Sequence, residues 1–96
     1  MIQTTSHVIV GIRYHLRPGT YIKPEDKIKL ILEPDNEYDS NAIGVYFNEQ
    51  KIGYIKASEA VSLAEHLNNE NITVHSYIHS IDINCKIIIH VQKHQF

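Results

Sequence analysis

KIKLILEPDNEYDSNAIGVYF, residues 27–47, is the stretch that decides the fold, because it places two apolar runs on either side of a crowded polar loop. The runs at residues 28–32 and 43–47 are rich in the β-branched and aromatic side chains that favour strands, and Pro34 ends the first run. Asp and Asn favour turns because their side chains hydrogen-bond nearby backbone groups, so one interpretation is a self-bonded connection. Tyr38 at the loop centre fits that interpretation less well, and a polar loop held by a rigid sheet is a typical binding surface.

Alternating apolar residues predict four further strands, and one segment has helical spacing. We expect these strands at residues 8–12, 52–55, 72–78 and 85–91, and the helix at residues 57–69. With the two strands above, this makes about six short strands, with the helix between the fourth and the fifth. Closure into a barrel hides the edge strands of so small a sheet. The sequence therefore predicts a mainly β protein, a small OB-like or SH3-like barrel.

The size and composition predict a single domain, residues 1–96, with one modest core. The hydrophobic content of 43% is that of an ordinary globular chain, and no apolar run approaches the ~20 residues that a membrane span needs. The polar start of the chain lacks the features of a signal peptide. Cys85, the single cysteine, lies in an expected strand, which predicts a buried, reduced thiol in a cytoplasmic protein.

The charge balance argues against a long contact with duplex nucleic acid. The 9 Lys and Arg residues are outnumbered by 11 Asp and Glu residues, which gives a net charge of −2 with neutral histidines. A wide footprint on duplex DNA usually needs a clear basic excess. The 7 histidines would move this balance toward zero or slightly positive if several were partly protonated. A small, local nucleic-acid site is compatible with these numbers.

Two further segments place aromatic and cationic side chains at expected strand ends. Residues 11–15, Gly-Ile-Arg-Tyr-His, end the first strand, and residues 51–56, Lys-Ile-Gly-Tyr-Ile-Lys, lead into the helix. An arginine can pair bidentately with phosphate, and a tyrosine can stack on a base. On a strand, Arg13 and His15 would share one side and Tyr14 the other, although a bend would bring all three to one pocket. The structural alternative is Arg13 in a salt bridge with the acidic loop and Tyr14 in the core.

Taken together, these segments resemble the HIRAN domain family. The matching features are GIRY at residues 11–14, Pro18-Gly19, the series at residues 33–45, IGYIK at residues 52–56, and a helix that begins near Glu59. They cover roughly residues 8–67, and the strand pair after the helix also fits. The resemblance implies an OB-like barrel that binds single-stranded DNA and, as in members appended to fork-remodelling helicases, captures a free 3′ end. It thus implies a role in DNA repair or replication-fork processing, without a cofactor, a metal or a catalytic residue.

Carried over by position, the resemblance also implies a site. Tyr14 and Tyr38 would bracket unstacked terminal bases, and Arg13 would contact the backbone. Asp39 would accept a hydrogen bond from the 3′-hydroxyl, with Asn36 in support. Stacking tolerates any base and contributes ~1–3 kcal/mol per base, while a carboxylate repels a continuing phosphodiester and so discriminates an end from a mid-strand position.

The rest of the implied site lies at two strand ends. Tyr54 and Lys56 would lie near the phosphates, and His15 stands where helicase-type members often carry another aromatic residue. The full implied set of DNA-binding residues is Arg13, Tyr14, His15, Asn36, Tyr38, Asp39, Tyr54 and Lys56. Glu33 and Glu37 depart from the pattern by adding negative charge close to the phosphates, and Ala57 stands where a further basic residue is common. Because the chain shows no helicase or nuclease domain, such an activity would come from a partner protein.

Two other functions remain open from the residues alone. The same barrel could be a protein–protein interaction domain that uses exposed strand edges and a tyrosine-rich surface. The carboxylates of Glu33, Asp35 and Asp39 could form the cluster of a metal-dependent nuclease.

The histidines of the last two strands raise the question of a metal site. They are His75, His79, His90 and His94. Strand residues four apart are separated by ~13 Å, too far to share one zinc ion. A cross-strand pair such as His75 with His90 could bind a metal weakly, and exposed histidines on a sheet face are the simpler interpretation.

Overall fold

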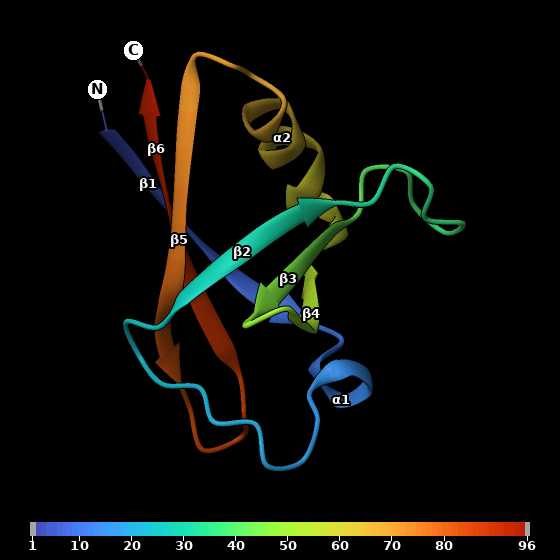
Figure 1. Ribbon diagram of the computed structural model, residues 1–96, viewed down its shortest axis with the longest axis vertical. Helices are drawn as coiled ribbons and strands as arrows, with labels where there is room; N and C mark the ends of the chain where they lie inside the picture. Colours follow the sequence, from blue (N-terminus) through green and yellow to red (C-terminus); the bar gives the residue numbers. More distant parts are fainter. Residues whose placement is uncertain (1, 96) are drawn as a thin grey trace.

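The computed structural model describes residues 2–95. The predicted domain of residues 1–96 therefore includes Met1 and Phe96, which lie outside the described residues. The elements are β1 (Ile2–Val10), α1 (Ile12–His15), β2 (Lys27–Leu32), β3 (Ile43–Phe47), β4 (Gln50–Ile55), α2 (Ala57–Leu67), β5 (Ile72–Ile81) and β6 (Ile87–Gln95). The strands follow the order β1-β4-β3-β2-β5-β6 around a closed barrel, and all pairs are antiparallel (Figure 1). The predicted mainly β barrel, with a helix between the fourth and fifth strands, is confirmed.

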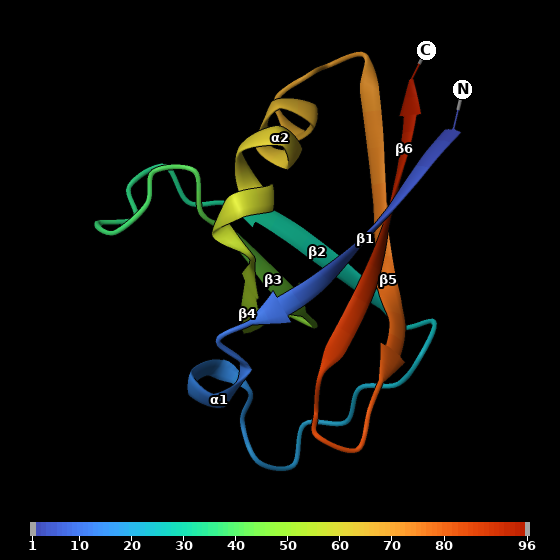
Figure 2. The ribbon, with the colours of Figure 1, turned by 180° about the vertical axis from the view of Figure 1, so that it is seen from behind.

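The barrel combines a long ribbon with a short sheet. Strands β1, β6 and β5 form the ribbon, and the shorter β2, β3 and β4 cross it (Figures 1 and 2). Only short seams join the two parts. Ile9 pairs with Ile55 and Val10 with Tyr54 between β1 and β4, whereas β2 joins β5 only at its first residues. The β1–β4 seam places the end of β1 beside the end of β4.

A glycine allows this seam to close. A Cβ atom at Gly53 would collide with the side chain of Ile9 and would lie 2.7 Å from the carbonyl oxygen of Val10. Real Cβ atoms do not approach backbone oxygens so closely, so β1 can approach β4 only where β4 lacks a side chain. Gly53 therefore allows the backbone of β1 to lie close to β4.

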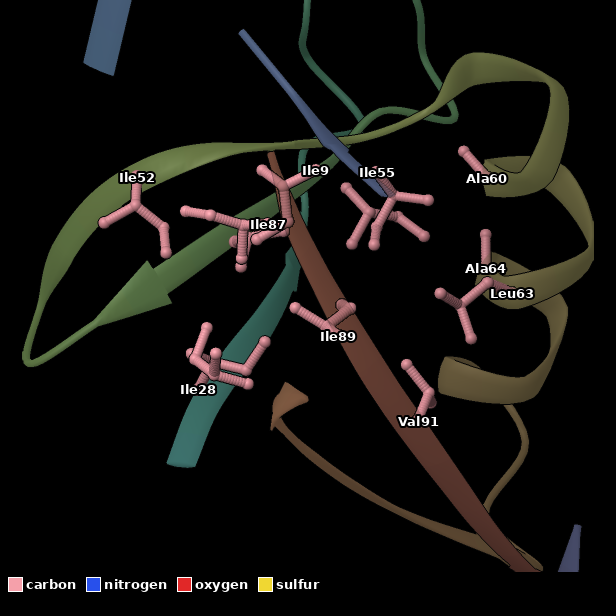
Figure 3. Packing of buried hydrophobic residues seen from close by; sticks show 13 residues of the cluster. Ile9, Ile28, Ile52, Ile55, Ala60, Leu63, Ala64, Ile87, Ile89 and Val91 are labelled. Atoms are coloured by element: carbon pink, nitrogen blue, oxygen red, sulfur yellow. The ribbon is translucent and has the colours of Figure 1, made fainter. Parts of the chain in front are cut away.

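Aliphatic side chains fill the barrel. On β6, Ile87, Ile89 and Val91 alternate inward and are fully buried, as the period of two along a strand requires. Helix α2 covers the core with Ala60, Leu63 and Ala64, which recur at helical spacing on one face (Figure 3). Each fully buried side chain of the size of Leu or Ile contributes roughly 1.5–3 kcal/mol.

The strands at residues 27–32 and 43–47 lie where they were predicted, but the first strand does not. Strand β1 begins at Ile2 rather than at residue 8, and it ends at Val10 rather than at residue 12. Gly11 takes the left-handed conformation, with φ of 76°, and residues 12–15 then turn into the short helix α1. The expected strand-like alternation of residues 13–15 is therefore wrong.

Other element boundaries also differ from the prediction. Helix α2 ends at Leu67 rather than at residue 69, β4 begins at Gln50, and β5 continues to Ile81. Strand β6 begins only at Ile87, because Asp82 accepts backbone hydrogen bonds from Asn84 and Lys86 and so closes a turn.

Cys85 lies in this turn and not in a strand. It has φ of 61° and is exposed, so the prediction of a buried thiol is wrong. No helix within residues 2–95 has both the length and the apolar character needed to span a membrane.

Candidate nucleic-acid interface

A groove of about 570 Å³ lies between the polar loop, residues 33–42, and the adjoining ends of β1 and β4. The loop projects from the barrel on the side that carries α1 and the start of α2 (Figure 1). The predicted site residues that line this groove are His15, Asn36, Tyr38, Asp39 and Tyr54. The structure thus brings together predicted residues from α1, the loop and β4, although they are far apart in the sequence.

The polar loop is organised by its own side chains. Oδ1 of Asn36 accepts hydrogen bonds from the backbone N–H groups of Tyr38 (2.9 Å) and Asp39 (3.1 Å). Oδ1 of Asp39 in turn accepts from the backbone N–H of Asn41 at 2.8 Å. The self-bonded interpretation is therefore correct for part of the loop. Oδ2 of Asp39 receives no hydrogen bond from residues 2–95, which leaves one carboxylate oxygen available at the groove.

Glu33 anchors this loop to the barrel. Its Oε1 accepts hydrogen bonds from Nδ2 of Asn36 (3.1 Å) and from the hydroxyl of Tyr54 (2.9 Å). The ammonium of Lys51 lies 2.6 Å from Oε2 of Glu33 and donates to the Tyr54 hydroxyl at 2.7 Å. Gly44 makes room for the carboxylate, because a Cβ there would lie 2.7 Å from Oε2.

The ionisation of this pair follows from its contacts. Partial burial alone would raise the pKa of Glu33, but the ammonium of Lys51 and the hydrogen bonds from Asn36 and Tyr54 hold that pKa below its ordinary value of 4.5. Burial alone would lower the pKa of Lys51, and its contacts with Glu33 and Tyr54 instead raise it above its usual range. Both groups are therefore charged at neutral pH, and the charge of Glu33 is compensated.

Tyr54 lines the groove, but its ring is packed against other side chains and is not free to stack on a base. Its ring packs edge-on against His15, with 5.3 Å between the centroids, and Nζ of Lys51 lies 4.6 Å from its centroid. Its hydroxyl is committed to Glu33. Tyr54 and His15 therefore shape the site by packing against each other.

Tyr14 and Tyr38 are the free aromatic rings of the predicted site. Tyr38 is 90% exposed at the tip of the loop, and Tyr14 is 80% exposed on α1. The alternative that places Tyr14 in the core is therefore wrong. Arg13 and Lys56 are also exposed, and neither forms an ion pair with another residue of the described chain. The alternative that places Arg13 in a salt bridge with the acidic loop is therefore wrong within residues 2–95.

Lys51 contributes to this site through Glu33 and Tyr54, which its sequence position did not predict. Nothing local marks Lys51, since its partner Glu33 is on another strand end. The contact could have been found only by predicting that β2, β3 and β4 pair in this order. That pairing places Lys51 and Tyr54 beside the start of the loop.

The four histidines considered for a metal site form two pairs rather than one cluster, and His75 does not pair with His90. The β5–β6 register pairs Tyr77 with His90, so His75 and His90 are not partners. Instead, His79 stacks on His90 with 3.9 Å between the centroids, and His75 meets His94 edge-on at 5.5 Å. Within residues 2–95 no group of three His, Cys, Asp or Glu side chains could hold a metal ion.

The nuclease alternative lacks its carboxylate cluster. It requires Glu33, Asp35 and Asp39 to converge on a metal, but Glu33 points to Lys51 and Tyr54. The cluster proposed for metal-dependent hydrolysis is therefore not formed in the described part of the chain.

The fold and the groove define a small, closed antiparallel β-barrel domain with a polar loop beside a groove at one end of the short sheet. The chain belongs to the HIRAN domain family, whose model matches residues 2–93. HIRAN domains are known as DNA-binding modules. No curated protein matches the sequence.

Two crystal structures share this fold. The HIRAN domain of human HLTF is 24% identical, with a TM-score of 0.81 over 94% of this chain and 74% of that chain. A protein from Lactobacillus plantarum is 21% identical, with a TM-score of 0.69 over 98% of this chain and 100% of that chain. At this identity the two similarities concern the fold.

Proposed function

We propose that this chain binds single-stranded DNA and prefers a free 3′-hydroxyl end, as a non-catalytic module in DNA repair or replication-fork processing. The observation that carries the proposal is the state of Asp39. One oxygen of its carboxylate holds the loop backbone, and the other is available at the groove beside the exposed ring of Tyr38. An available carboxylate oxygen can accept a hydrogen bond from a terminal hydroxyl, whereas a continuing phosphodiester offers no donor and is repelled.

The two exposed tyrosines support a grip on unstacked bases. His15 lines both the groove that contains Tyr38 and a second groove that contains Tyr14. Stacking on such rings contributes ~1–3 kcal/mol per base whatever the sequence. A grip on one or two nucleotides needs few cations, so the net charge of −2 is compatible with it.

The unpaired cations complete the proposed site. Neither side chain lines the groove, but Arg13 is on α1 with His15, which does, and Lys56 lies in the chain between Ile55 and Ala57, which also line it. We assign the backbone phosphates to these two side chains. An exposed Arg or Lys without a protein partner can contact a phosphate without first breaking an ion pair within the protein.

The test compares oligonucleotides that differ only at their 3′ end. Fluorescence anisotropy with a short, 5′-labelled oligonucleotide is expected to show clear binding with a 3′-hydroxyl and sharply weaker binding with a 3′-phosphate. Equal affinity for the two ends would rule out end capture, and failure to bind either would rule out the DNA-binding function.

A protein–protein interaction domain is the second candidate, favoured by the same exposed tyrosines. It predicts that Tyr38→Ala abolishes the binding of a partner protein and leaves any DNA binding unchanged. A helicase or nuclease partner would also supply the enzymatic activity under the first proposal. A cytoplasmic location, in which the exposed thiol of Cys85 stays reduced, belongs to the same proposal.

A further inference from the structure

A second groove, of about 490 Å³, shares the lining residue His15 with the first one. We propose that this second groove and the segment 13–23 bind the nucleotides on the 5′ side of the captured 3′ end, with Arg17 on a phosphate and Tyr21 stacked on a base. This inference rests on the proposed function, and it adds a binding surface that makes the contact longer than a terminal dinucleotide.

Charge supports single-stranded DNA as the occupant. Residues 1–24 contain no Asp or Glu, although the whole chain has 11 of them. Arg13, Arg17 and Lys23 lie in this acid-free part. Lys23 pairs with Asp26 at 3.6 Å, while Arg13 and Arg17 have no ion-pair partner within residues 2–95. Arg17 lines the second groove, and Arg13 precedes it on the same segment. Guanidinium groups without a protein partner complement a phosphate backbone, to which arginine binds bidentately.

The aromatic side chains of this segment are unusually accessible. Tyr21 is 92% exposed and Tyr14 is 80% exposed, so neither ring is used in the core. Alternation of accessible rings with cations is the pattern by which proteins follow a single strand, since each ring can stack on a base while each cation meets the backbone. A duplex would not offer its bases to these rings.

The segment is held in place before any DNA arrives. The hydroxyl of Thr20 donates to Oε1 of Gln50 at 3.0 Å, and the backbone N–H of Thr20 donates to the carbonyl of Arg17 at 3.1 Å. The first contact fastens the segment to β4, and the second forms the turn at Pro18. The segment then passes along one end of the barrel from α1 to β2 (Figures 1 and 2). A fixed segment loses less conformational entropy when it binds a strand.

One residue opposes the proposal electrostatically and thereby provides a test. Glu49 lines the second groove together with Arg17, and it is exposed. The other local charge, Lys51, is already compensated by Glu33 at 2.6 Å. Removing the carboxylate of Glu49 should therefore strengthen binding to a strand long enough to reach this groove, and should leave a terminal trinucleotide unaffected.

The experiment measures how affinity depends on the length of the strand. The probes are 5′-fluorescein oligothymidylates of three and eight nucleotides, each prepared with a free 3′-hydroxyl and with a 3′-phosphate, titrated at several salt concentrations. We expect the wild type to bind the longer probe at least about fivefold more tightly, since one added phosphate contact and one stacked base exceed 1 kcal/mol together. Arg17→Gln should remove most of this difference and lower the salt slope by about 0.7. Tyr21→Ala should reduce the difference without changing the slope.

Matched variants separate local effects from general ones. Arg17→Lys keeps the charge and should keep the salt slope. Glu49→Gln should increase the affinity for the longer probe only. Glu70→Gln, on the connection between α2 and β5, should leave the affinity for both probes unchanged.

Each outcome decides something. If the wild type binds the two probes with equal affinity, the second groove does not bind DNA. The same conclusion follows if Arg17→Gln and Tyr21→Ala both leave the difference in affinity between the probes unchanged. A 3′-hydroxyl preference on the trinucleotide in that same experiment would still support the proposed function. A length difference that depends on Arg17 but ignores the 3′ end supports the second groove and contradicts end capture. Binding of neither probe overturns both.

Discussion

The hydroxyl of Tyr54 donates a hydrogen bond to the carboxylate of Glu33 at 2.9 Å, which joins strand β4 to the first residue of the polar loop. Glu33 also accepts a hydrogen bond from the side chain of Asn36, and Asn36 in turn accepts hydrogen bonds from the backbone N–H groups of Tyr38 and Asp39. An exposed loop is thereby tied to the barrel by a continuous series of hydrogen bonds. Loop residues that act on a ligand need such support, because a rigid scaffold sets their position.

Asp39→Asn tests end recognition. The amide oxygen can still accept from the backbone of Asn41, but the amide group neither carries the charge nor replaces the second carboxylate oxygen. Hydrogen bonds to charged groups contribute about 1.5–3 kcal/mol, so binding of a 3′-hydroxyl oligonucleotide should weaken about tenfold or more. Binding of the 3′-phosphate form should be unchanged or stronger. Anisotropy titrations of both oligonucleotides check this, and an unaltered preference for the hydroxyl end would contradict the role of Asp39.

Tyr38→Ala tests base stacking. Because this side chain is 90% exposed, its removal should leave the thermal midpoint of unfolding within experimental error. DNA binding should lose ~1–3 kcal/mol, the contribution of one stacked base. Tyr38→Phe keeps the ring and should bind almost as the wild type does. If the phenylalanine variant is as weak as the alanine variant, the hydroxyl rather than the ring face makes the contact.

Glu33→Gln tests the pH dependence of stability. The folded-state pKa of Glu33 is lowered from 4.5, so its contribution is present above the unfolded-state value and is lost as the pH falls through the folded-state value. Urea denaturation between pH 6 and about 3 should show a decrease in the free energy of unfolding that is smaller in the variant. Glu70→Gln, at an exposed position, is the control and should retain the wild-type dependence. Identical pH profiles for wild type and Glu33→Gln would show that this network does not stabilise the fold.

Gly53→Ala tests the seam between β1 and β4. The added methyl group would meet Ile9 and the carbonyl of Val10, so the strands must separate or the side chain of Ile9 must move. Overpacking of this kind typically costs about 1–3 kcal/mol, measurable as a lower urea midpoint. Ser62→Ala, exposed on α2, is the control and should change little. A Gly53→Ala variant as stable as the wild type would mean that the seam adjusts freely.

Much of the barrel could be predicted because strand formation here depends on local pattern. Residues 27–32 and 43–47 are apolar or alternate between polar and apolar side chains, and turn-forming residues bound them. The structure places β2 and β3 on these residues. The boundaries that failed depend on distant contacts. Residues 12–15 turn into α1 with Ile12 and Leu16 packed against the core, and Cys85 is displaced from β6 by the turn that Asp82 forms.

The sequence by itself determined the fold class and, through its motifs, a family and a set of candidate residues. Local side-chain periodicity and short motifs are readable without knowing what lies nearby in space. Only the tertiary structure decided that Glu33 meets Lys51 and Tyr54, that Tyr14 and Tyr38 are free while Tyr54 is engaged, and that His75 and His90 do not pair. Each of these depends on strand order and register, which bring together side chains from different strands, and no local pattern specifies those contacts.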